Sequence, residues 1–148
     1  MKQYNPEMHT AEHVLNQTMV RMFGCGRSFS NHLERKKSKC DYRFDRPLTP
    51  EEEKEIERRV NEILASHLDV TEETVSREEA SKEFDLDRLP DSSGEQIRIV
   101  RVGNYDACPC IGEHVKNTKD VGKFVFGSSS YEDEVLRIRF KLKRPQSS

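Results

Sequence analysis

Apolar and basic side chains alternate along one segment near the end of the chain, residues 135–143. The apolar set is Leu136, Ile138, Phe140 and Leu142, and the basic set is Arg137, Arg139, Lys141 and Lys143. Because successive side chains of a β-strand point to opposite faces, this pattern predicts a strand with one apolar and one basic face. Such a strand suits a sheet that is covered on one side and solvated on the other, which is typical of antiparallel sheets.

Two earlier segments carry apolar residues at helical spacing. The first predicts a helix over about residues 6–23, which Gly24 can end. Its apolar stripe consists of Met8, Ala11, Val14, Leu15, Met19 and Met22. The second predicts a helix over about residues 50–67, because residues 49–52 (Thr-Pro-Glu-Glu) form a capping box in front of another apolar stripe.

Shorter elements are predicted around these helices. Residues 24–46 are expected to hold two short strands joined by a basic turn at 35–37, and a brief third helix is expected from Ser76 to about Phe84. Further strands are expected near residues 69–71, 97–100 and 123–127, with a loop at 85–95. The order of helix, strands, helices and strands predicts an α+β fold, a two-layer sandwich whose antiparallel sheet carries helices on one face.

The composition limits the size of the hydrophobic core and indicates where in the cell the chain is expected. With 33% hydrophobic and 35% charged residues among 148, the core must be thin, and residues 1–148 are expected to form one domain with a trailing end near 144–148. The formal net charge of −2 means that any RNA contact must come from a local basic patch. We expect a cytoplasmic protein with reduced thiols and no membrane contact, since no apolar run approaches about 20 residues.

Two pairs of residues have the types and spacing of metal ligands. His9 and His13 lie four residues apart on the first predicted helix, so both rings project from one face. Cys110 and His114 repeat that spacing about a hundred residues later, in a predicted loop. Imidazole and thiolate donors suit zinc and argue against magnesium or calcium, so the sequence predicts one Zn²⁺ site. Cys108 is an alternative thiol to Cys110.

The two pairs sit in longer strings that resemble the editing domain shared by alanyl-tRNA and threonyl-tRNA synthetases. Residues 9–15 (His-Thr-Ala-Glu-His-Val-Leu) resemble its first motif, and residues 110–118 (Cys-Ile-Gly-Glu-His-Val-Lys-Asn-Thr) resemble its second. The resemblance covers roughly residues 5 to 142. It implies a two-layer α+β fold and a zinc site that hydrolyses mischarged tRNA, in the alanine branch typically seryl- or glycyl-tRNA(Ala).

This resemblance also sets expectations about partners. A chain of 148 residues has no room for an aminoacylation core, so it resembles the freestanding, AlaX-type form that acts in trans. We therefore expect tRNA(Ala) carrying a wrong amino acid as partner, and neither ATP binding nor tRNA charging. Two departures from the family pattern, Ile111 and Glu113, lie close to where the aminoacyl group should enter.

Several residues carry alternative interpretations. Glu113 is a candidate general base or a solvated carboxylate, and Thr10 is a candidate contact for the amino acid hydroxyl or a structural residue. The four basic residues at 137–143 are candidate tRNA contacts or simply a solvated sheet face.

Two other functions remain open. Residues 9–13 also fit the His-x-x-Glu-His motif of a metallopeptidase. This hypothesis gives Cys110 and His114 no role as metal ligands. The altered residues Ile111 and Glu113 also suit a non-catalytic zinc module that binds tRNA or a protein.

Overall fold

The computed structural model describes residues 6–34, 37–84, 96–110 and 112–143. Its elements, in chain order, are α1 (Pro6–Phe23), β1 (Ser30–Leu33), β2 (Ser38–Arg43), α2 (Pro50–Ala65), β3 (Val70–Ser76), α3 (Arg77–Glu83), β4 (Gln96–Val102), β5 (Asp106–Pro109), the 3-10 helix η2 (Thr118–Asp120), β6 (Lys123–Glu132) and β7 (Val135–Lys143).

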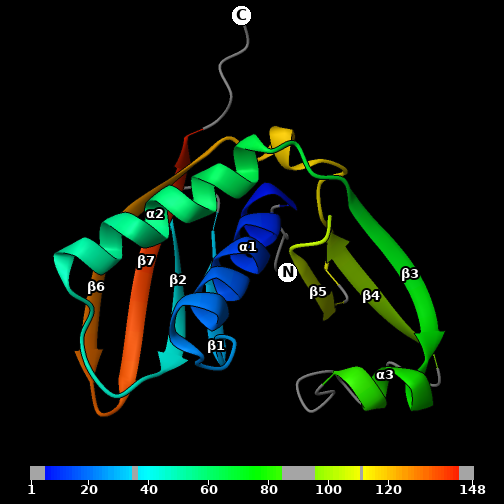
Figure 1. The fold of residues 1–148 in the computed structure, drawn as a ribbon, viewed down its shortest axis with the longest axis horizontal. Helices are drawn as coiled ribbons and strands as arrows, with labels where there is room; N and C mark the ends of the chain where they lie inside the picture. Colours follow the sequence, from blue (N-terminus) through cyan, green and yellow to red (C-terminus); the bar gives the residue numbers. More distant parts are fainter. Residues whose placement is uncertain (1–5, 35–36, 85–95, 111, 144–148) are drawn as a thin grey trace, which may run out of the picture.

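The described strands form two antiparallel sheets. Four of them run in the order β1-β2-β7-β6, and three in the order β3-β4-β5. Figure 1 shows α1 running between the two sheets, with α2 above it across one face of the four-stranded sheet, and α3 beside the smaller sheet. The α+β prediction is therefore confirmed, with the antiparallel strands divided between two sheets.

The two long helices follow their sequence signals closely. Helix α1 ends at Phe23, where Gly24 adopts a φ of +67° and donates its N–H to the carbonyl of Val20 at 2.9 Å. Helix α2 begins with the predicted capping box of Thr49 and Glu52. It ends at Ala65, two residues before the predicted end. The loop at 85–95, part of the turn at 35–37 and the trailing end at 144–148 lie outside the described residues.

Three strands differ from the sequence prediction. Strand β3 continues to Ser76 and β6 to Glu132, and β5 occupies residues 106–109, for which the sequence predicts no strand. The added part of β6 is rich in serine and contains a bulge between Phe126 and Ser128. Polar strands of this kind lack the alternation of apolar residues that identifies β7, because their burial is incomplete.

The main core lies between the two long helices and the four-stranded sheet. Its largest fully buried side chains include Tyr42, Phe124 and Phe140, and the last two rings stack with centroids 5.1 Å apart. A second, small cluster of Ala80, Ile97 and Ile99 lies between α3 and the smaller sheet. None of the described helices has both the length and the apolar character of a membrane span.

Candidate metal centre

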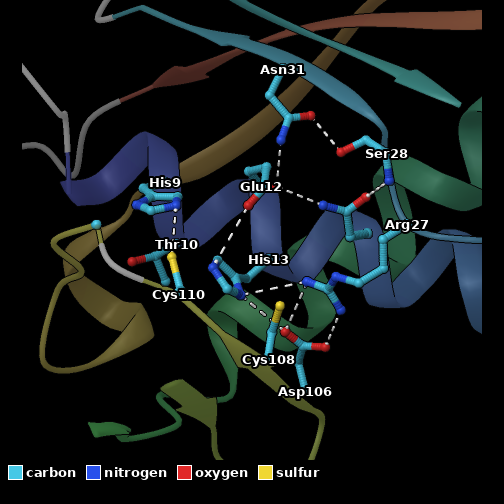
Figure 2. Close-up of polar contacts among 12 residues, drawn as sticks. His9, Thr10, Glu12, His13, Arg27, Ser28, Asn31, Asp106, Cys108 and Cys110 are labelled. Carbon is cyan, nitrogen blue, oxygen red and sulfur yellow. Dashed lines mark hydrogen bonds and ion pairs between the residues drawn. The ribbon is translucent and has the colours of Figure 1, made fainter. Parts of the chain in front are cut away.

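The four side chains predicted as metal ligands meet between α1 and the segment that follows β5. His9 and His13 come from α1, and Cys110 and His114 come from that segment. One donor atom of each lies within 4.8 Å of every other, and His9 Nε2 is 3.3 Å from Cys110 Sγ (Figure 2). Tetrahedral zinc holds its nitrogen ligands about 3.3 Å apart, so only small shifts separate this cluster from a zinc site.

The imidazole rings are packed against one another. The centroid of the His114 ring lies 4.3 Å from that of His9 and 4.6 Å from that of His13. Both ring nitrogens of His114 are buried without a hydrogen-bond partner among the described residues. Burying imidazole nitrogens unpaired is unfavourable, and a shared cation would satisfy them. The cluster therefore fits a metal ion of the zinc type.

The two neighbouring thiols differ in their surroundings. Burial acts to raise the pKa of Cys110, but the imidazoles of His114, His13 and His9 lower it to about 3, which favours the thiolate that zinc binds. Burial raises the pKa of Cys108 to about 12, and this residue is not part of the donor cluster. The structure thus favours Cys110 over Cys108 as the sulfur donor.

Both histidines of α1 are oriented through Nδ1. The carboxylate of Asp106, in β5, accepts from His13 Nδ1 at 3.2 Å, and the carbonyl of Glu113 accepts from His9 Nδ1 at 3.2 Å. In ligand histidines one ring nitrogen is commonly held in this way by a carboxylate or carbonyl, and the other nitrogen, here Nε2, is the one that binds the metal.

Asp106 is held in turn by groups from two other parts of the chain. Arg27 Nη1 lies 2.7 Å from Asp106 Oδ1, and Gln17 Nε2 donates to the same oxygen at 2.9 Å. Burial acts to raise the pKa of Asp106, yet the bond from His13 and the Arg27 guanidinium keep it well below its usual range. Burial acts to lower the pKa of His13, but Glu12, Asp106 and Cys110 raise it to about 9 in the absence of bound metal.

The sequence interpretation missed Asp106 and Arg27, since neither residue belongs to a motif or to a periodic segment.

The segment that carries Cys110 and His114 is held in place by hydrogen bonds from β4. Arg98 Nε donates to the carbonyl of Cys110 at 2.9 Å, and its Nη2 donates to the carbonyl of Gly112. A Cβ at Gly112 would overlap the His9 ring, so glycine is required for this close approach.

The hydroxyl of Thr10 joins the same segment to α1. It donates to the carbonyl of Pro6 at 2.8 Å and lies 3.2 Å from the N–H of Val115, from which it accepts. Thr10 is fully buried, so these bonds assign it a structural role. Contact with a substrate hydroxyl stays a prediction, as does catalysis by the exposed side chain of Glu113.

The predicted basic face of β7 is present in the four-stranded sheet. Leu136, Ile138 and Phe140 are buried, whereas the basic residues between and after them are half-buried or exposed. Arg137 binds the carboxylate of Asp41 through Nε and Nη2, at 2.8 and 3.0 Å. The alternation is therefore confirmed, and tRNA binding by Arg137, Arg139, Lys141 and Lys143 stays a prediction.

Comparison with known proteins gives one family. Residues 97–139 match the threonyl and alanyl tRNA synthetase second additional domain. The alanine–tRNA ligase of Coxiella burnetii (strain Dugway 5J108-111) is 32% identical over 123 residues, which are 82% of this chain and 14% of the ligase. That of Thermoanaerobacter sp. (strain X514) is 32% identical over 136 residues, 87% of this chain and 15% of the ligase.

A third relative extends the match. The alanine–tRNA ligase of Treponema denticola is 30% identical over 142 residues, which are 90% of this chain and 23% of the ligase. The chain thus spans between about a seventh and a quarter of the length of these relatives. We conclude that it is a homologue of the second additional domain of threonyl- and alanyl-tRNA synthetases, the editing domain that its sequence resembles.

Proposed function

We propose that this chain hydrolyses the ester bond of mischarged aminoacyl-tRNA in trans, with Zn²⁺ as cofactor and seryl- or glycyl-tRNA(Ala) as substrate. The observation that carries the proposal is the convergence of His9, His13, Cys110 and His114 on one point. A second line of support is the sequence similarity to alanine–tRNA ligases, whose name contains both the amino acid and the tRNA.

The side chains around the cluster have separate tasks in this proposal. The three imidazoles and the Cys110 thiolate would hold the zinc ion, which would supply Lewis acidity for the hydrolysis of an ester. Asp106 and the carbonyl of Glu113 keep the His13 and His9 rings in the required orientation. The carboxylate of Glu113, exposed beside His114, is the proposed acceptor for the proton of the attacking water.

The direct test is deacylation in solution. Zinc-loaded protein in excess is incubated with Ser-tRNA(Ala), Gly-tRNA(Ala) and Ser-tRNA(Thr), with correctly charged Ala-tRNA(Ala) as the substrate that should persist. We expect release of serine or glycine from tRNA(Ala), lost in a Cys110→Ala variant together with bound zinc. Absence of turnover with all three mischarged tRNAs would contradict the proposal.

One observation favours a second candidate, a non-catalytic zinc module that binds tRNA. Four protein donors are the usual sign of a structural zinc site, whereas catalytic sites commonly keep three and an open position. This alternative predicts that the protein binds tRNA but releases no amino acid in the deacylation assay. The metallopeptidase alternative leaves two members of the cluster, Cys110 and His114, without a role, and it predicts that Cys110→Ala retains zinc.

A further inference from the structure

Glu12 is a buried carboxylate that the proposed chemistry does not yet use. It lies on α1 directly before His13, and only 7% of the residue is exposed. Its Oε1 atom accepts two hydrogen bonds, from Asn16 Nδ2 at 2.7 Å and from Asn31 Nδ2 at 2.9 Å (Figure 2). One donor comes from the next turn of the same helix and the other from β1.

The two amide groups are themselves fixed by Ser28. The N–H of Ser28 donates to Asn16 Oδ1 at 2.8 Å, and its hydroxyl donates to Asn31 Oδ1. Since Ser28 is fully buried, this network holds the Glu12 carboxylate in one orientation. A site whose polar groups are held in place before binding loses little freedom when a ligand arrives.

The second oxygen of Glu12 points toward the metal cluster. Its Oε2 atom lies 3.8 Å from His13 Nε2, the ring nitrogen on the side of the other ligands, which is too long for a hydrogen bond. Among the described residues no lysine or arginine forms an ion pair with Glu12, whereas Asp106 is paired with Arg27. His13 is the one ion-pair partner of Glu12 among the described residues, and that contact is long, so a cationic donor group bound at the cluster would be stabilised by a shorter, charge-assisted bond to Oε2.

We propose that Glu12 Oε2 binds the α-ammonium group of the aminoacyl ester and so restricts the site to acyl groups with a free amino group. This inference rests on the proposed function. In an aminoacyl ester the ammonium nitrogen is one carbon away from the carbonyl, so binding at Oε2 places the carbonyl beside the cluster. The contact is a charge-assisted hydrogen bond in a buried setting, the strong class of such bonds.

The test measures binding rather than turnover. One ligand is serine joined by a stable amide to 3′-amino-3′-deoxyadenosine, and the second has hydrogen in place of the α-ammonium group. Calorimetry with zinc-loaded wild-type protein should show a roughly 10- to 100-fold preference for the first ligand. Glu12→Gln preserves the shape and the bonds to Asn16 and Asn31 but removes the charge. We expect this variant to keep its zinc and to lose the preference.

Two further variants define the outcome. Glu78→Gln removes an exposed carboxylate on α3 and should leave the preference intact. Glu12→Asp keeps the charge but withdraws it by one methylene, so it should reduce the preference without abolishing it, and it serves if Glu12→Gln fails to fold. An unchanged preference in either Glu12 variant overturns the inference, as does loss of zinc from Glu12→Gln. If the wild-type protein binds neither ligand, the proposed function itself fails.

Discussion

Cys108 and Cys110 are separated by a single residue, yet their environments lead to opposite expectations. Cys110→Ala removes the thiolate from the donor cluster, so zinc affinity should fall by at least about 100-fold. Cys108→Ala removes a neutral, partly buried thiol that donates to the carbonyl of Pro109, and zinc affinity should stay within a few-fold of wild type. Chelator competition at neutral pH measures both values. Equal zinc loss in the two variants would return Cys108 to the list of ligands.

Asp106 is expected to act on the metal through His13. Replacing it by asparagine leaves a group that can still accept from Nδ1 but carries no charge, so the imidazole becomes a weaker ligand. Loss of such a supporting contact typically weakens metal affinity by about 10- to 100-fold. Zinc affinity of Asp106→Asn, measured by the same competition, should fall within that range. Asp120→Asn, an exposed carboxylate on η2, is the matched control and should bind zinc as wild type does.

Arg27 is the second charged partner of Asp106, so its replacement tests how that carboxylate is stabilised. Arg27→Gln would leave the fully buried Asp106 carboxylate without its guanidinium partner and with His13 as its remaining ion-pair partner, which breaks a pair whose acidic member is shielded from water. Such changes cost about 3–5 kcal/mol when both partners are buried, and Arg27 is itself partly exposed, so the lower end applies. Urea denaturation of the zinc-free protein measures the loss. A change below about 1 kcal/mol would mean that water replaces the guanidinium.

At the scale of elements, the start of α2 links stability to pH. Glu52 accepts from the N–H of Thr49 at 2.9 Å and binds Arg46 through two bonds of 2.8 Å. The Arg46 guanidinium and the Thr49 N–H lower the pKa of Glu52 from 4.5 to about 2. A lowered pKa in the folded state stabilises the protein above about pH 4.5, and this stabilisation disappears as the pH falls through about 2.

Glu52→Gln should therefore be slightly less stable than wild type at neutral pH, with the difference shrinking below pH 4.5. The effect should be small because the pair is largely solvated. Glutamine can still accept from Thr49, so the cap itself survives the change. Thermal unfolding at several pH values gives the comparison. Glu51→Gln, in the same turn but without an Arg46 contact among the described residues, separates this pair from the general effect of acidic groups at a helix start.

The sequence predicted the elements with strong local signals and missed those without them. Helices α1 and α2 have apolar stripes with caps or stops at their ends, and β7 alternates without a break, so each is visible from its own residues. Strand β5 is only four residues long, and the far half of β6 is polar. These segments become strands because β4 and β7 offer hydrogen-bonding edges, which no local pattern reveals.

At the scale of the whole molecule, only those parts of the candidate metal centre that have a local sequence pattern could be predicted. The paired spacing of His9 with His13 and of Cys110 with His114 predicted the donor set, because each pair is local. The supporting groups are not local: Asp106 lies 93 positions from His13 and 79 from Arg27. Their meeting depends on how α1 packs against β5, a relation that a single sequence does not display.

The basic face of β7 carries the last prediction, which concerns contact with tRNA. Lys141 and Lys143 are exposed, with no ion pair among the described residues, whereas Arg137 is already bound to Asp41. If the phosphate backbone lies on this face, each lysine replaced by alanine should weaken tRNA binding and reduce the salt dependence by about one released ion. Arg137→Gln should have a smaller effect, since Asp41 already compensates its charge.

Filter binding across a series of salt concentrations measures affinity and salt dependence together. Arg58→Gln is the control, because Arg58 is exposed on α2, away from this face, and is paired with Glu55 and Glu62. An identical salt slope for wild type and the Lys141→Ala, Lys143→Ala double variant would show that the face is merely solvated. Since the net charge of the chain is −2, tRNA must then be bound by another local group of cations.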